Sequence, residues 1–268
     1  SGRCSLCVNH LCVSHILSNF AFQMMSRYFI YLSFDGTAYH GWQIQPNGIS
    51  VQQVLQERLS TLLRGTIEVV GAGRTDAGVH AHLMVAHFDY DGELDGAQLA
   101  YKLNRMMPRD IAIHDVRKVA DDLHARFSAV KRTYHYYIHT HRNPFHRFYS
   151  LEMPYQLDFE AMNEAARLLL DVKDFGSFCK AGADVKTTLC DLTKAEWIKM
   201  EEPGCWYFEI SANRFLRNMV RAVVGTLVEV GRGRMTLDEF RAVVASGSRK
   251  NAGESMPAHA LFLWDIVY

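Results

Sequence analysis

A glycine-rich stretch in the first third of the chain gathers polar side chains that could do chemistry. Residues 71–80 have the sequence GAGRTDAGVH, which places Arg74, Asp76 and His80 within seven residues. A carboxylate beside an arginine suits chemistry at a sugar carbon, where it can act as nucleophile or base toward a glycosidic centre, or stabilise an oxocarbenium-like charge. The arginine favours the ionised carboxylate, and glycine lets the backbone approach a substrate closely. Asp76 is therefore the candidate catalytic residue, and we expect His80 to support the loop.

Nucleotide-binding loops are also rich in glycine, but their patterns do not fit these residues. A dinucleotide-binding fingerprint would need glycine at position 76, where Asp76 would instead repel a pyrophosphate. A P-loop would end in Gly-Lys-Ser/Thr, whereas this stretch continues as Ala77-Gly78-Val79. Taken alone, the stretch could still be a turn in which Asp76 bonds to its own backbone. A glycoside hydrolase with paired carboxylates also stays open, because Asp35 or Asp89 could approach Asp76 in space.

Further blocks extend this pattern over most of the chain. GAGRTDAGVHA resembles the signature of the TruA family of tRNA pseudouridine synthases, and the similarity spans about Arg27 to Tyr268. The other matching blocks are 34–36 with Tyr39 and 41–43, then 50–52, 124–129 (HARFSA), 132–136 (RTYHY), 174–178 (DFGSF) and 212–221 (ANRFLRNMVR). The resemblance implies an α+β fold, the pseudouridine synthase fold, with two similar halves around a central cleft.

The resemblance also assigns roles to individual residues. Asp76 matches the aspartate that attacks or deprotonates the ribose of the target uridine, so that the glycosidic bond breaks and the uracil rejoins through C5. Arg74 matches the arginine that holds the nucleotide out of the RNA, since a stacked base is beyond reach. Tyr134 occupies the place of the tyrosine that stacks on the uracil and removes the C5 proton. Arg221 matches the ionic partner of the aspartate.

Other residues are expected to contact the substrate. Thr75 lies in the loop, and Leu261 and Phe262 resemble an apolar pair that lines the uracil pocket. Arg214, Arg217 and Arg221 are spaced i, i+3, i+7, which places them on one face if residues 213–230 form a helix. We expect phosphate contacts from the remaining basic residues, which are Arg126, Lys131, Arg132, Arg214 and Arg217.

Charge distribution agrees with an RNA partner even though the formal net charge is zero. Segment 123–151 contains arginine and lysine, and segment 210–228 contains three arginines, but neither has an acidic residue. A neutral total can thus hide a basic face that attracts phosphate. The resemblance implies tRNA, through its anticodon stem-loop at uridines 38–40, as substrate, a homodimer, and no cofactor or metal. A catalytically inactive RNA-binding module of the same fold is the alternative.

The elements that must position these residues follow from local patterns. Alternation and β-branched or aromatic runs predict strands at 28–34, 66–70, 83–88, 111–116, 133–139, 189–198, 206–211 and 261–267. Ser50 with Gln53, and Thr236 with Glu239, have the spacing of capping boxes. Helices are predicted from 50 to about 64, and at 98–106, 158–170, 213–230 and 236–245. This mixture predicts an α+β fold with a largely antiparallel sheet, in halves 25–130 and 131–268.

Residues 1–24 differ from the rest and are expected to be a leader or a remnant of a tag, disordered or not native. They carry a single charge, Arg3, and Met24-Met25 precedes the first clear strand. Polar residues interrupt the apolar core that a signal peptide needs, and no apolar run is long enough for a membrane span. Six cysteines without a pairing pattern indicate a reducing, cytoplasmic location. Cys4, Cys7, Cys12 and His15 offer four possible zinc ligands, but their spacing matches no common zinc finger.

Overall fold

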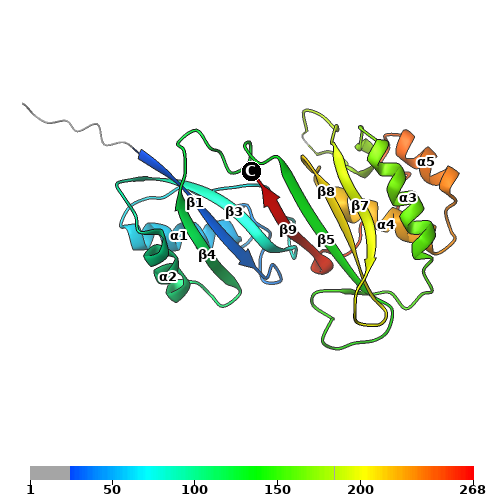
Figure 1. The fold of residues 1–268 in the computed structure, drawn as a ribbon, viewed down its shortest axis with the longest axis horizontal. Coiled ribbons are helices and arrows are strands. Elements are labelled where there is room, and N and C mark those ends of the chain that lie inside the picture. The colour runs from blue at the N-terminus through cyan, green and yellow to red at the C-terminus, as the bar shows by residue number, and fades with distance from the viewer. Residues whose placement is uncertain (1–24, 184) are drawn as a thin grey trace, which may run out of the picture.

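The computed structural model describes residues 25–183 and 185–268, and these form one nine-stranded sheet flanked by helices (Figure 1). The strand order is β4-β1-β3-β9-β5-β8-β7, with β2 added to β3 and β6 to β5. Neighbouring strands are antiparallel except β3 with β9 and β5 with β6, so the prediction of an α+β fold with a largely antiparallel sheet is confirmed. The strands are β1 (Met25–Phe34), β2 (Val70–Gly71), β3 (His80–Asp91), β4 (Ile111–Lys118), β5 (Lys131–His139), β6 (Leu151–Glu152), β7 (Leu192–Lys199), β8 (Cys205–Ala212) and β9 (Leu261–Val267).

Helices pack against both ends of the sheet (Figure 1). Helices α1 and α2 lie beside the N-terminal strands, and α3, α4 and α5 beside the C-terminal ones. In the described part of the chain, every helix is too short or too polar to cross a bilayer. The predicted leader, and the cysteines within it, lie outside the described residues. The helices are α1 (Val51–Leu63), α2 (Gly96–Met106), α3 (Phe159–Leu168), α4 (Met219–Gly231) and α5 (Leu237–Ala245), with 3₁₀ turns at 169–171, 176–178 and 258–260.

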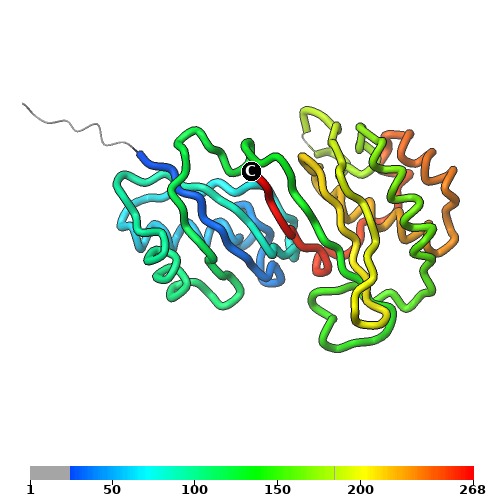
Figure 2. The backbone as a smooth tube through the Cα atoms, viewed as in Figure 1, coloured from blue at the N-terminus to red at the C-terminus, as the bar shows by residue number. Residues whose placement is uncertain are grey.

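The C-terminal strand joins two hydrophobic cores. One core is built from the N-terminal strands with α1 and α2, and the other from the C-terminal strands with α3, α4 and α5. Strand β9 runs between β3 and β5, as Figure 2 shows in red, and contributes Leu261 to the second core but Leu263 and Ile266 to the first. Because β9 pairs with β3 at only two positions, the ladder that joins the two halves of the sheet is short.

The predicted starts of α1 and α5 are confirmed, but only one of the two predicted capping boxes is complete. The Ser50 hydroxyl accepts a hydrogen bond from the backbone of Gln53, but the Gln53 amide bonds to Glu57, so only half of the predicted capping box forms. At α5 both halves form between Thr236 and Glu239. Since each cap satisfies backbone donors that the first helical turn leaves unpaired, these residues fix where α1 and α5 begin.

The strand predicted at 66–70 is wrong except for its last residue. Side chains of α1 bond to this backbone in place of a neighbouring strand: Gln52 donates to the Val69 carbonyl at 2.7 Å, and Gln56 accepts from the Val69 N–H at 3.2 Å. The segment is therefore extended but belongs to no ladder until β2 pairs with β3 at Val70 and Gly71. This arrangement ties the start of the glycine loop directly to α1.

The helix predicted at 213–230 begins six residues later, at Met219. Asn218 has φ +65°, a left-handed conformation that breaks a continuous helix. The preceding backbone bonds elsewhere, since Asn213 N donates to Asp191 and Arg217 O accepts from Lys180 N. Arg214 and Arg217 thus lie in a loop before the helix, and the predicted single face of three arginines is incorrect.

Candidate functional site

Asp76 lies in the loop between β2 and β3, and a second loop from the chain's opening segment holds it there. Trp42 N donates to the Thr75 carbonyl at 3.4 Å, and Gly78 N donates to the Tyr39 carbonyl at 3.3 Å. Gly41 has φ +82°, and a Cβ there would lie 2.2 Å from the Thr75 oxygen. The 34–43 block therefore positions the 71–80 loop, which carries the candidate catalytic residue Asp76, because only glycine at position 41 allows this approach.

Arg221, in the first turn of α4, pairs with Asp76 across 145 residues of sequence. Its NH1 lies 3.2 Å from Asp76 Oδ2, while its Nε donates to the Met256 carbonyl at 2.6 Å. The Asp76 and Arg221 side chains are 28% and 20% exposed, so the carboxylate can still be reached from solvent. The structure thus places Asp76 and Arg221 within hydrogen-bonding distance of each other. The Met256 carbonyl, which the sequence patterns did not indicate, holds the Nε side of the guanidinium.

The other two arginines of the block differ in position. Arg217 Nε lies 3.9 Å from Asp76 Oδ1 on a side chain that is 60% exposed, which makes it a weak second partner open to solvent. Arg214 is half-buried and donates to the Thr187 carbonyl at 3.4 Å. Arg74 is exposed on the catalytic loop, whereas the neighbouring Thr75 is buried and its hydroxyl makes no hydrogen bond to any described residue.

Tyr134 projects from β5 at the junction of the two cores and packs against both. Its ring meets Phe215 edge to face, with centroids 5.0 Å apart. Burial raises the pKa of Tyr134 to about 12, with the Asp76 carboxylate adding to the shift and Arg132 opposing it. The phenol is therefore protonated at neutral pH, and the negative charge of Asp76 is near enough to Tyr134 to favour this protonated form.

The two predicted apolar residues of β9 point to opposite faces of the sheet. Leu261 is buried in the second core, opposite Tyr136, on the face that also carries Tyr134. Phe262 is opposite His135 and stacks on His80, with centroids 4.6 Å apart. Because side chains alternate along a strand, Leu261 can share a pocket with Tyr134 but Phe262 cannot. The prediction of a lining pair is therefore supported only for Leu261.

His80 supports the loop through both ring nitrogens, as predicted. Nδ1 accepts from the Gly36 N–H at 2.9 Å, and Nε2 lies 2.9 Å from the His259 carbonyl, which requires a proton on Nε2. Burial lowers the pKa of His80, in keeping with a neutral ring that accepts through one nitrogen and donates through the other. The ring thus connects the loop to the turn before β9.

Arg132 has its donors engaged within the protein. Its guanidinium donates to the carbonyls of Ala72, Arg126, Ala129 and Asn213. Desolvation by burial lowers its pKa. These bonds join the catalytic loop, the 124–129 loop and the end of β8, so Arg132 acts as a clamp rather than as the free phosphate contact that we predicted.

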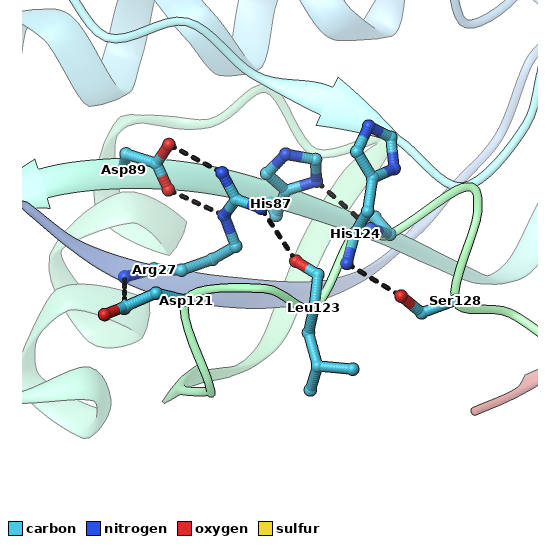
Figure 3. A network of polar contacts seen from close by, with 8 residues as sticks. Arg27, His87, Asp89, Asp121, Leu123, His124 and Ser128 are labelled. Atoms are coloured by element: carbon cyan, nitrogen blue, oxygen red, sulfur yellow. Dashed lines mark hydrogen bonds and ion pairs between the residues drawn. The ribbon is translucent and has the colours of Figure 1, made fainter.

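The 124–129 block forms a tight loop in which His124 N donates to Ser128 (Figure 3), and Arg126 in this loop is exposed. His124 Nδ1 accepts from the backbone N–H groups of Arg126 and Phe127, at 3.1 and 3.3 Å, and Ser128 Oγ accepts from His124 N at 2.9 Å. Lys131 has a different position, because it lines a broad depression of about 870 Å³ on the sheet face that also carries His135. Of these two predicted phosphate contacts, only Arg126 extends from the loop that Arg132 connects to Ala72.

Neither candidate second acid reaches Asp76. Asp89 accepts two hydrogen bonds from Arg27, both at 2.8 Å (Figure 3). Asp35 accepts from Tyr149 at 2.8 Å and lies 3.0 Å from His80. Among the described residues, the charged partners of Asp76 are Arg221 and Arg217, so the arrangement does not support a paired-carboxylate hydrolase.

Comparisons with known proteins identify the family of the chain. A family model described as tRNA pseudouridine synthase matches residues 30–128 and 165–268, which include Asp76 and Arg221 but not Tyr134. The chain is 58% identical to a tRNA pseudouridine synthase A of Bacteroides thetaiotaomicron, over 91% of each chain. It is 56% identical to that of Bacteroides fragilis, over 91% of this chain and 97% of the relative, and 37% identical to that of Bacillus pumilus, over 88% and 97%. The chain therefore belongs to the TruA family of tRNA pseudouridine synthases.

Proposed function

We propose that this protein isomerises uridine to pseudouridine at positions 38–40 of the tRNA anticodon stem-loop. In this reaction the N1–C1′ bond breaks, a C5–C1′ bond forms, C5 loses its proton and N1 gains one. Atoms and electrons balance within one nucleotide, so no donor, oxidant or cofactor is consumed. The names of the relatives support tRNA as the substrate. The observation that carries the proposal is the solvent-accessible Asp76 carboxylate held 3.2 Å from Arg221.

Asp76 acts on the ribose of the flipped uridine, and Arg221 sets its orientation. The Arg221 guanidinium is itself fixed by its hydrogen bond to the Met256 carbonyl, so the Asp76 carboxylate bonds to a partner that is already held in place. A group prepositioned in this way loses little freedom when substrate arrives, which is a main source of enzymatic rate enhancement. Chemistry at C1′ thus depends on two segments that are far apart in the chain.

Tyr134 and Leu261 hold the extruded uracil, and Arg74 holds the RNA open. Leu261 and the Tyr134 ring share one face of the sheet, which supplies an apolar wall for a base. Stacking needs only that ring, whereas removal of the C5 proton requires the Tyr134 hydroxyl to lose its own proton, against a pKa of about 12. Arg74 is exposed on the loop and can occupy the space that a flipped nucleotide leaves.

Exposed arginines around the loop bind the phosphates. Arg74, Arg126 and Arg217 all reach solvent, and Arg126 and Arg217 come from segments that contain no acidic residue. Binding through several such contacts weakens steeply as salt increases, because counterions are released from the RNA. The family resemblance further leads us to propose a homodimer, with tRNA contacts from both subunits, in the cytoplasm.

Mapping pseudouridine in bulk tRNA treated with the purified protein tests this function. We expect new pseudouridine at 38–40 with the wild-type chain and none with Asp76→Asn, while the variant retains tRNA binding because the loop keeps its shape. Full activity in Asp76→Asn would exclude the assigned carboxylate. Binding without modification by the wild-type chain would instead favour an inactive RNA-binding module.

A further inference from the structure

A histidine, a glutamate and a cysteine converge at the edge of the C-terminal half, away from the catalytic loop. His146 lies in the loop of residues 140–150 between β5 and β6, Glu202 in the turn between β7 and β8, and Cys205 begins β8. One ligand atom of each, an imidazole nitrogen, a carboxylate oxygen and the sulfur, lies within 4.8 Å of the others. Figure 2 shows the green 140–150 loop beside the yellow turn that carries Glu202. Two chain segments, the 140–150 loop and the turn that leads into β8, thus meet at this cluster.

These donors match the preferences of zinc. Thiolate, imidazole and carboxylate bind Zn²⁺ at about 2.0–2.3 Å, so tetrahedral ligand atoms lie roughly 3–4 Å apart. His146 Nε2 is already 3.0 and 3.1 Å from the two Glu202 oxygens. We propose that His146, Glu202 and Cys205 form a zinc-binding site, with a water molecule as the fourth ligand.

Surrounding groups orient these ligands. Asn143 Nδ2 donates to Glu202 Oε1 at 3.2 Å, and the His146 carbonyl accepts from the backbone N–H groups of Tyr149 and Ser150. Cys205 is directly opposite His139, whose Nδ1 bonds to Ser150 Oγ at 2.9 Å. Such neighbours that fix a ligand's angle are typical of metal sites and preserve the geometry that metal binding needs.

The thiol chemistry is consistent with a metal that replaces a proton. The Cys205 side chain is buried, with 1% of its surface exposed, and its sulfur must lose its proton to bind a metal. Binding therefore breaks the S–H bond, forms a sulfur–metal bond and releases the proton to solvent, with no change in oxidation state. Affinity should increase with pH for this reason.

The site would hold the base of a loop that crosses to the other half. This loop presents Phe145, Phe148 and Tyr149 to solvent, and the Tyr149 hydroxyl donates to Asp35 at 2.8 Å. The family model does not match residues 129–164, which include His146. A metal here would make the contact between the loop and the N-terminal half more rigid.

Titration of the metal-free, full-length protein with Co²⁺ tests the site. We expect one equivalent to bind with a thiolate-to-cobalt charge-transfer band in the near ultraviolet, and Zn²⁺ to displace it. Cys205→Ser should abolish the band and His146→Ala should weaken binding at least tenfold, with circular dichroism confirming that both variants fold. A band that persists in Cys205→Ser, or no band in the wild-type protein, would overturn the proposal.

Other cysteines supply the matched controls. A Cys4→Ser, Cys7→Ser, Cys12→Ser triple variant removes thiols outside the described residues, and Cys190→Ser removes another buried thiol. Both should bind cobalt as the wild type does, and loss of the band in either would place the metal elsewhere.

Tryptic cleavage after Arg142 and Arg147 gives an independent readout. Free Zn²⁺ at one hundred times its Kd should slow cleavage about 100-fold if the loop must release the metal to open. The Cys205→Ser variant should show no such protection. Equal protection in that variant would show that zinc acts at another site.

Discussion

Replacing Arg221 by methionine tests the geometry on which the proposed chemistry depends. At the 3.2 Å separation of NH1 and Asp76 Oδ2, and an effective dielectric constant of about 20, the attraction is about 5 kcal/mol before desolvation. Net contributions of hydrogen bonds to charged groups are nearer 1.5–3 kcal/mol, or roughly 10- to 150-fold in rate. Loss of the Asp76 orientation should reduce the rate by a similar amount, since misplacing a reacting group by about 1 Å can lower the rate about 10²-fold. We therefore expect Arg221→Met to lower the single-turnover rate about 100-fold.

The assay is release of tritium from uridine C5 of labelled tRNA under single-turnover conditions. Arg221→Lys keeps the charge but cannot bond to Asp76 and Met256 together, so we expect an intermediate loss of roughly tenfold. Arg217→Met is the matched control at enzyme concentrations that saturate tRNA binding, so that loss of its proposed phosphate contact does not limit the rate. Its side chain is 60% exposed and 3.9 Å from Asp76, and an exposed pair contributes at most about 1 kcal/mol, so we expect a loss of less than about fivefold. A folded Arg221→Met variant with a rate within twofold of the wild type would refute the positioning role.

Three further perturbations test other parts of the argument. Tyr134→Phe keeps the stacking ring, so tRNA binding should persist while the single-turnover rate falls at least tenfold; an unchanged rate would leave the hydroxyl without a chemical role. Gly41→Ala places a methyl group 2.2 Å from the Thr75 carbonyl at φ +82°, and should lower the free energy of unfolding in urea by about 1–3 kcal/mol and slow turnover; wild-type behaviour would contradict the tight approach. Burial lowers the pKa of His135 to about 4, below an ordinary value of about 6.5, so the unfolded chain binds more protons between these values. The contribution of neutral His135 to the free energy of unfolding is complete above pH 6.5 and decreases as the pH falls toward 4, by about 2 kcal/mol between pH 7.5 and 5. In urea unfolding, His135→Gln should remove this part of the pH dependence of stability.

Much of the secondary structure could be predicted because its signals are local. Ser50 and Thr236 cap the helices that their spacing indicated, and β9 has the bounds 261–267 that its apolar residues suggested. Caps act over three residues and strand alternation over two, so both are visible in a short window of sequence. The helix at 213–230 was misplaced because its early backbone groups bond to Asp191 and Lys180, far from any such window.

Asp76 was identifiable from sequence because a carboxylate and an arginine among glycines are unusual for a plain turn. What the loop could not reveal was its partner: Arg221 is 145 residues away, and the resemblance to a family, rather than any local pattern, indicated it. Only the folded chain brings α4 against the loop, with Met256 on the far side of the guanidinium. The short distance between Asp76 and Arg221 depends on the order of the strands in the sheet, which is set by pairing between distant parts of the chain.

The tertiary structure also separated residues that the sequence had grouped together. Arg132 and Arg126 are both basic, yet the donors of Arg132 are taken by backbone carbonyls while Arg126 is exposed. Leu261 and Phe262 are adjacent and apolar, yet they lie on opposite faces of β9. The sequence by itself determined which residue types were present and which short segments became helix or strand. The fold decided which donors remain free and which side chains share a face, because hydrogen bonds and strand register are set by partners from distant parts of the chain.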